Sequence, residues 1–263
     1  AGISDAPTTW DELLDDVAKL KDAGKTPIAL AGGSKWPYLM WAAYLIDRIG
    51  GPEVMQNILD GKADAWSDPA VIEAMTKIQE LVDAGAFGDS YQSMSADDKK
   101  DTALLANGQA SFDLMGSWVY ADFGTINADF AKNDLGYAAF PAVDGGKGDP
   151  SMLTGNLANY WSVAASASKE SQKTAINYLK ENTYSDGIVD GLLKSGGVPP
   201  VKGIEDKVKS ADDGSGFLTY NYQLSLDVAL PADQGQALLN NLEQVFLKQI
   251  TPQQFADAMN KTL

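Results

Sequence analysis

The chain has 263 residues, of which 44% are hydrophobic and 21% charged, proportions that are typical of a globular protein. Its 36 acidic and 20 basic residues give a net charge of −16, so neither nucleic acid nor an anionic membrane surface is expected as a partner. The absence of cysteine and histidine excludes disulfides, zinc sites of the usual kind, cysteine nucleophiles and Ser-His-Asp triads. No metal and no cofactor is expected.

The first hundred residues are predicted to be mainly helical. Thr9 and Glu12 match a capping box at the start of the first helix, and Gly24 matches its end. A loop that begins with Gly32-Gly33 follows the first strand. The predicted helices cover about residues 10–23, 37–48, 52–59, 69–84 and 95–107, and the predicted strand covers residues 27–31.

Residues 110–118 are the stretch with the clearest functional signal. Residues 110–115 have the pattern of a short strand, Gly116 follows, and Ser117 is a candidate helix N-cap. This order predicts that Trp118 lies at the C-terminal edge of a sheet, where ligands of open α/β folds bind. Taken alone, a tryptophan is more often a core residue, so packing and binding both remain open.

The second half is predicted to continue the alternation of strands and helices, which indicates the α/β class. Residues 142–154 are rich in Gly, Pro, Asp and Ser and indicate an exposed loop or a crossing between lobes. The predicted strands cover residues 135–140 and 157–165, and the predicted helices cover residues 117–132, 168–182, a shorter segment ending at 194, 217–227, 233–248 and 251 onward.

Several short motifs occur in a fixed order, and each is a helix start or a turn signature. They are residues 7–13 (PTTWDEL), 68–71 (DPAV), 81–85 (LVDAG), 108–111 (GQAS), 116–118 (GSW), 168–169 (SK), 230–231 (LP) and 251–256 (TPQQFA). Together they resemble the family 1 extracellular solute-binding proteins of ABC sugar importers, the group that contains the maltose- and xylobiose-binding proteins.

The resemblance implies an α/β fold of the periplasmic-binding-protein type II kind. Members usually carry a further segment before the first motif, so the chain is expected to be truncated and to form mainly the C-terminal lobe. The expected division is residues 1–155 for the first part of that lobe, residues 156–204 for a returning strand and helices of the N-terminal lobe, and residues 205–263 for closing helices.

The resemblance also implies a ligand-binding role, without catalysis, at seven positions. They are Trp36, Tyr38, Trp118, Asp227, Asn156, Tyr160 and Trp161. A sugar suits them chemically, because a rigid aromatic ring buries the C–H face of a pyranose while carboxylates and amides bond its hydroxyl rim. Lys35 and Gln234 border these segments but match no motif.

Each candidate also has a packing interpretation that the pattern leaves open. Trp36 and Tyr38 fit either a binding loop or a packed one, and Asp227 fits a helix cap. Tyr160 and Trp161 are adjacent on a predicted strand, so one of them is expected in the core.

The function implied is oligosaccharide binding by the solute receptor of an ABC importer, with the membrane permease as a partner. The full-length form is expected at the extracellular face, periplasmic or lipid-anchored, and uncovered faces of the truncated form could produce a homodimer. A glycoside hydrolase is the first alternative, although no pair of strand-end carboxylates stands out. A receptor for a non-sugar solute is the second, although the only arginine, Arg48, lies within a helix rather than in a loop.

Overall fold

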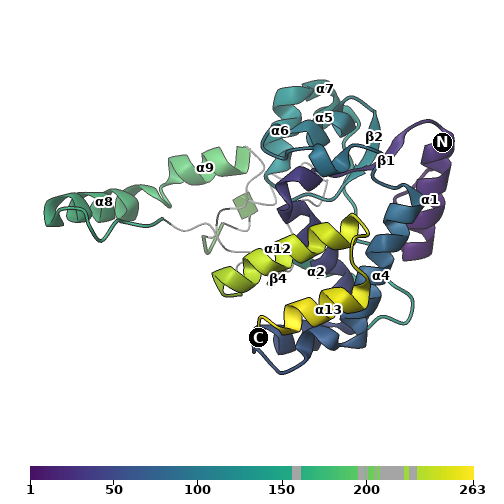
Figure 1. The fold of residues 1–263 in the computed structure, drawn as a ribbon. Helices are drawn as coiled ribbons and strands as arrows, with labels where there is room; N and C mark the ends of the chain where they lie inside the picture. Colours follow the sequence, from purple (N-terminus) through teal and green to yellow (C-terminus); the bar gives the residue numbers. More distant parts are fainter. Residues whose placement is uncertain (156–160, 195–198, 200, 205, 208–221, 225–229) are drawn as a thin grey trace.

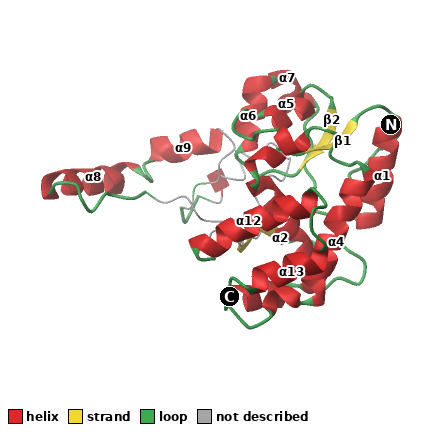
Figure 2. Ribbon diagram, viewed as in Figure 1, coloured by secondary structure: helices red, strands yellow, loops and turns green. Residues whose placement is uncertain are grey.

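A computed structural model describes residues 1–155, 161–194, 199, 201–204, 206–207, 222–224 and 230–263 of the chain. Helices form most of the described part, with short strands between them (Figure 2). The helices are α1 (Trp10–Asp22), α2 (Trp36–Gly50), α3 (Pro52–Leu59), α4 (Pro69–Ala84), α5 (Lys100–Ala106), α6 (Val119–Ile126), α7 (Ala128–Asn133), α8 (Lys169–Asn182), α9 (Asp186–Lys194), α12 (Ala232–Phe246) and α13 (Pro252–Asn260). The strands are β1 (Thr26–Ala29), β2 (Ala110–Asp113), β3 (Leu153–Gly155) and β4 (Tyr222–Leu224), and the 3-10 turns are η1 (Gly32–Ser34), η2 (Ala65–Ser67) and η3 (Tyr91–Ser93).

The described strands form two parallel pairs. Strand β1 pairs with β2, with Thr26 opposite Ala110 and Ala29 opposite Asp113. Strand β3 pairs with β4 in the same parallel sense. Parallel pairing requires a long crossover between the strands, and helices supply it in both cases.

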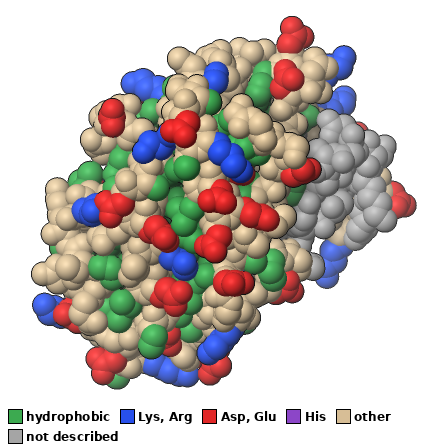
Figure 3. Space-filling model, turned by 90° about the vertical axis from the view of Figure 1, so that its right-hand side faces the viewer, with side chains coloured by type: hydrophobic (Ala, Val, Ile, Leu, Met, Phe, Trp, Pro, Cys, Tyr) green, Lys and Arg blue, Asp and Glu red, His purple; other side chains and the backbone are tan. Residues whose placement is uncertain are grey.

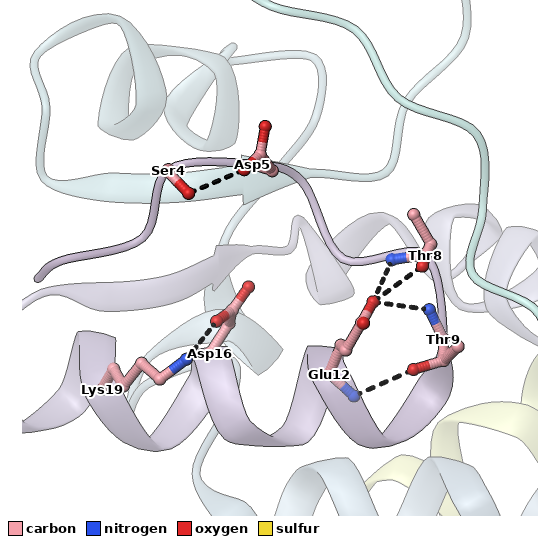
Figure 4. A network of polar contacts seen from close by, with 7 residues as sticks. All are labelled: Ser4, Asp5, Thr8, Thr9, Glu12, Asp16 and Lys19. Carbon is pink, nitrogen blue, oxygen red and sulfur yellow. Dashed lines mark hydrogen bonds and ion pairs between the residues drawn. The ribbon is translucent and has the colours of Figure 1, made fainter.

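Helix α1 shows how strongly local sequence fixes an element. The Thr9 hydroxyl accepts a hydrogen bond from the Glu12 amide at 3.3 Å, and the Glu12 carboxylate accepts bonds from the amides of Thr8 and Thr9 (Figure 4). These bonds lower the pKa of Glu12, because they stabilise its ionised form. The capping box predicted from the sequence is confirmed, and α13 begins with a second one formed by Thr251 and Gln254.

Helix α2 lies at the centre of the main body and packs against α4, α12 and α3 (Figure 1). It is almost entirely buried, which explains why its sequence is apolar on all sides. Helix α13 packs beside α12 and α4 and closes the same core. The C-terminal helices therefore complete a core that the first hundred residues begin.

Helices α8 and α9 extend away from this body (Figure 1). No residue of α8 is buried. Helix α9 buries Val189 and Leu193 in a small cluster with Val201 and Ile204, separate from the main core. Several large apolar side chains on these two helices and between them remain exposed, namely Ile176, Tyr178, Tyr184, Ile188 and Leu192.

Five predicted elements differ from the structure. Residues 135–140 form no strand; Phe140 stacks on Tyr44 at 4.6 Å, and Ala142 forms an isolated bridge to Thr9. The helix predicted over residues 217–227 is wrong at 222–224, which form β4. The helix predicted over residues 95–107 begins only at Lys100. The strand predicted over residues 157–165 is absent at 161–165, and its other residues lie outside the described part.

The helix predicted over residues 117–132 is interrupted at Asn127. This residue has an extended backbone, with φ −153° and ψ 92°. Its side chain accepts a bond from the Phe130 amide at 3.1 Å and donates to the Ala106 carbonyl at 3.0 Å. Asn127 therefore caps a new helix, α7, instead of continuing α6.

On the face shown in Figure 3, charged side chains do not form one basic patch. Acidic side chains spread over much of this face with basic side chains among them. Among the described helices, none combines the length and the apolar character that crossing a bilayer requires.

Candidate functional site

Two loops meet where the parallel strands β1 and β2 end. Because the strands are parallel and in register, their C-terminal ends lie at the same edge. Strand β1 leads through η1 into α2, whose first residue is Trp36. Strand β2 leads through Gly116 to Trp118, which directly precedes α6. The topology thus brings together two tryptophans that are far apart in the sequence.

The two indole rings form a pair, which we call the aromatic pair (Trp36 and Trp118). Their centroids are 6.0 Å apart and their planes lie at 61°, an edge-to-face arrangement. Trp118 is 54% exposed, whereas Trp36 is partly buried. The sequence predicted the strand-end position of Trp118 and left open whether its ring is packed or exposed; the structure exposes it.

The Trp118 ring packs against the backbone of Gly116. A Cβ atom at this position would come within 2.1–2.6 Å of three ring atoms of Trp118, so the indole lies directly against the glycine backbone. Any larger residue would have to displace the ring. The glycine before Ser117 is therefore required for the packing of the ring.

The loop that carries Trp36 is held on one side by η3 and the residues after it. The Gly33 amide donates to the Met94 carbonyl at 2.8 Å, and a Cβ atom on Gly33 would lie 2.8 Å from that same oxygen. The Ser34 hydroxyl accepts from the Ala96 amide at 3.0 Å. These contacts fix the backbone immediately before the aromatic pair.

Polar side chains of α12 border the same loop. The Lys35 ammonium contacts the Glu243 carboxylate at 2.8 Å and donates to the Asn240 side-chain oxygen at 3.0 Å. Gln236 donates to that oxygen at 3.3 Å. Sequence reasoning missed Asn240 and Glu243. The helical pattern of residues 233–248 places both on the polar face, but it cannot show which loop that face adjoins.

Gln234, which the sequence placed near the site, has a structural role. Its side-chain amide donates to the Thr262 carbonyl at 2.8 Å and ties α12 to the end of the chain.

Tyr38 requires a correction. The structure places it in the core, where it is fully buried and stacks on Phe246 at 4.1 Å. Burial raises the pKa of its hydroxyl, with smaller contributions from Tyr91 and Glu243. Helix α2 explains the difference from the prediction, because a residue two positions after Trp36 points to another side of a helix. Tyr38 is accordingly left out of the candidate site.

Replacing Tyr38 by Phe tests this correction. The hydroxyl is buried and has no hydrogen-bond partner among the described residues, so its removal relieves a desolvation cost. We expect the free energy of unfolding of Tyr38→Phe, measured by urea denaturation, to be unchanged or higher. A clear loss of stability would show instead that the hydroxyl is bonded.

Of the other predicted positions, only Trp161 lies among the described residues. It is 76% exposed in an irregular stretch, and no ring contact described for the structure joins it to Trp36 or Trp118. Asn156, Tyr160 and Asp227 lie outside the described residues. Their roles remain predictions.

The carboxyl group at the end of β2 is buried beside another acid. Desolvation raises the pKa of Asp113 well above its usual value, and the nearby Asp101 raises it further. Burial likewise raises the pKa of Asp101. Both groups have an oxygen without a hydrogen-bond partner among the described residues, and Asp101 is almost fully buried. Within that part of the chain, no group of three acidic residues is arranged to hold a metal ion.

Curated relatives match parts of the chain. The multiple sugar-binding protein of Streptococcus mutans is 28% identical over 206 residues, which are 76% of this chain and 47% of that protein. A probable sugar-binding periplasmic protein of Rhizobium meliloti is 29% identical over 120 residues, 44% of this chain and 27% of that protein. The chain thus spans about half or less of the length of these relatives.

Solved structures match nearly the whole chain. One, from work on xylan utilization by the thermophilic bacterium Caldanaerobius polysaccharolyticus, has a TM-score of 0.81 and 26% identity and covers 98% of this chain and 66% of that chain. A chitin oligosaccharide binding protein has a TM-score of 0.79 and 25% identity, with 98% and 64% coverage. These matches confirm the fold class, an α/β fold of the periplasmic-binding-protein kind, present in part.

A protein family matches as well. Residues 1–184 fit the family described as bacterial extracellular solute-binding protein. The match covers more than half of the chain and includes the loops of both tryptophans. The chain therefore belongs to the bacterial extracellular solute-binding protein family.

Proposed function

We propose that this chain is the carbohydrate-binding part of the solute receptor of an ABC importer and that it performs no catalysis. The aromatic pair at the end of the β1–β2 strand pair is the observation that carries the proposal. The family supports it, as do relatives named as sugar-binding proteins. An oligosaccharide is the proposed ligand.

The geometry suits one face of a sugar ring. The exposed part of Trp118 offers an apolar surface against which the C–H face of a pyranose can lie. Asn240 and Gln236, on the neighbouring helix α12, carry amide groups that can bond hydroxyls at the rim. An apolar face together with amide groups beside the loop that carries Trp36 is a chemical complement of a pyranose.

We propose two lobes for the receptor. Residues 1–155 and 205–263 would form the C-terminal lobe, and residues 156–204 would belong to the other. The extension of α8 and α9 away from the main core supports this division. Closure of the two lobes about the connecting segments would enclose the ligand, and the closed form would then dock on the membrane permease.

The family also supports a location at the extracellular face of the membrane, either periplasmic or lipid-anchored. If a homodimer forms, the exposed apolar side chains of α8 and α9 are the surface on which we place it.

The variant Trp118→Ala tests the binding site. Loss of the stacking surface is expected to weaken sugar binding by about 1–3 kcal/mol, by analogy with the loss of base–aromatic stacking. Isothermal calorimetry with xylo-, cello-, malto- and chito-oligosaccharides measures the dissociation constants. Tyr178→Ala, which removes an exposed aromatic of α8, is the control and should leave them unchanged.

Two outcomes would contradict the proposal. If the unaltered protein shows no measurable binding to any of the four oligosaccharide series, the result would count against a sugar ligand. Turnover of a chromogenic glycoside that is lost on replacing one Asp or Glu would instead indicate a glycoside hydrolase.

A further inference from the structure

Lys35 has an unusual backbone conformation. Its φ is 61° and its ψ is −45°, at the junction between η1 and α2. A residue with a Cβ atom rarely adopts a positive φ, and lysine lacks the short side chain that lets Asn or Asp tolerate it. Such strain persists only where the surrounding structure holds it in place.

Lys35 is held by backbone bonds to neighbouring residues and by side-chain contacts with α12. Its amide donates to the Gly32 carbonyl at 2.9 Å, and its own carbonyl accepts from the Tyr38 amide at 3.0 Å. Its ammonium is bound to Glu243 and Asn240 of α12. The Lys35 and Glu243 side chains are only 34% and 33% exposed, so solvent screens this pair less than it screens a fully exposed one.

The residue that follows is Trp36, the inner member of the aromatic pair. A change in the backbone of Lys35 would redirect the first turn of α2 and with it the Trp36 ring, whose centroid lies 6.0 Å from that of Trp118. From these contacts we infer that Lys35 is a positioning residue. Its ion pair with Glu243 holds the strained backbone that sets Trp36 against Trp118.

This inference rests on the proposed function for its consequence in binding, but not for its geometry. Helix α12 lies far from Trp36 in the sequence. Its Glu243 side chain nevertheless binds Lys35 and so fixes the loop that carries Trp36. Contact between helix α12 and this loop therefore sets the shape of the candidate site.

The test uses two variants, each of which removes the ion pair between Lys35 and Glu243 from a different side. Lys35→Met keeps most of the aliphatic stem and removes the charge, and Glu243→Gln leaves the lysine in place. The readout is the far-ultraviolet circular dichroism couplet of the two indoles, defined as the signal that the unaltered protein loses in Trp118→Phe. Both variants are expected to lose at least half of this couplet and to bind the best oligosaccharide about threefold to tenfold more weakly.

Lys248→Met is the matched control. Lys248 also has a positive φ, 55°, and also forms an ion pair, with Asp83, but it has no described contact with a tryptophan. Its couplet and affinity should stay at the values of the unaltered protein. An equal loss in this control would show a general effect of charge and would overturn the inference.

The couplet separates this inference from the proposed function. If the unaltered protein binds no oligosaccharide but Lys35→Met and Glu243→Gln lose the couplet, the positioning role stands and the proposed function fails. If either variant folds, as shown by a cooperative thermal transition, and keeps the full couplet, Lys35 does not position Trp36. If Lys35→Met does not fold, Glu243→Gln decides the question alone.

Discussion

Arg48→Ala is expected to lower the free energy of unfolding by about 3–5 kcal/mol, one of the two largest effects expected in this protein. Arg48 and Asp47 form an ion pair at 2.6 Å, and both side chains are almost completely buried. Removing the arginine leaves a buried carboxylate without its counter-charge. Urea denaturation of the variant measures the loss.

Arg48 also fastens a distant segment onto α2. Its guanidinium Nη2 donates to the Met152 carbonyl at 2.7 Å and to the Pro150 carbonyl at 3.2 Å, just before β3. Gly146 and Gly148 pack against the Arg48 and Asp47 carbonyls so closely that a Cβ atom would lie 2.1–2.2 Å from them. The variant should therefore also increase hydrogen exchange in residues 146–153.

Two controls distinguish a buried ion pair from an exposed one. Lys100→Ala breaks the pair with Asp98 at 3.2 Å, in which both side chains are more than half exposed, and should cost about 1 kcal/mol or less. The double variant Asp47→Asn with Arg48→Met removes both charges and should recover much of the stability lost in Arg48→Ala. Equal costs for Arg48→Ala and Lys100→Ala would contradict this account.

Phe246→Ala should produce a loss of similar size, about 3–5 kcal/mol, because it empties space in a close-packed core. Phe246 is fully buried at the end of α12, where it stacks on Tyr38 and lies 5.7 Å from the Phe87 ring. Its carbonyl accepts a bond from the Tyr91 hydroxyl at 2.8 Å, which the substitution does not remove directly. The expected loss therefore reports mainly the missing ring.

Chemical denaturation again gives the measurement. Phe246→Leu retains most of the apolar volume and should cost clearly less than the alanine variant. Tyr178→Ala removes an exposed ring and should stay within about 0.5 kcal/mol of the unaltered protein. A Phe246→Ala variant as stable as Tyr178→Ala would show that α12 does not complete this core.

Local signals in the sequence gave most helix boundaries. Asp68 caps α4 with proline at its first position, and Ser168 caps α8, both as the sequence predicts. Such signals succeed because a cap bonds to amides two or three residues away. They fail where a residue has a distant partner. Asn127, for example, lies in a stretch whose pattern predicts a continuous helix, but its side chain caps a new helix and bonds to Ala106.

Local sequence signals also predict the burial of tryptophan side chains only in part. Trp41 is buried, as its place in an apolar helix predicts. The polar neighbours of Trp66 in the sequence favour a surface position, but Trp66 is fully buried with its ring 6.0 Å from that of Phe255 in α13. The stretch around Trp66 is polar, and only the return of the last helix covers it.

The sequence by itself determined the class of fold, the starts of α1 and α13, the order of the family motifs and the strand-end position of Trp118. Only the tertiary structure decided which aromatic rings are accessible: Trp118 is exposed, Tyr38 is buried under Phe246, and Lys35 is tied to Glu243. Caps, turns and motifs depend on bonds between near neighbours, so the local order of residues specifies them. Burial and ion pairing depend on segments that meet only when the chain folds, so no local pattern specifies them.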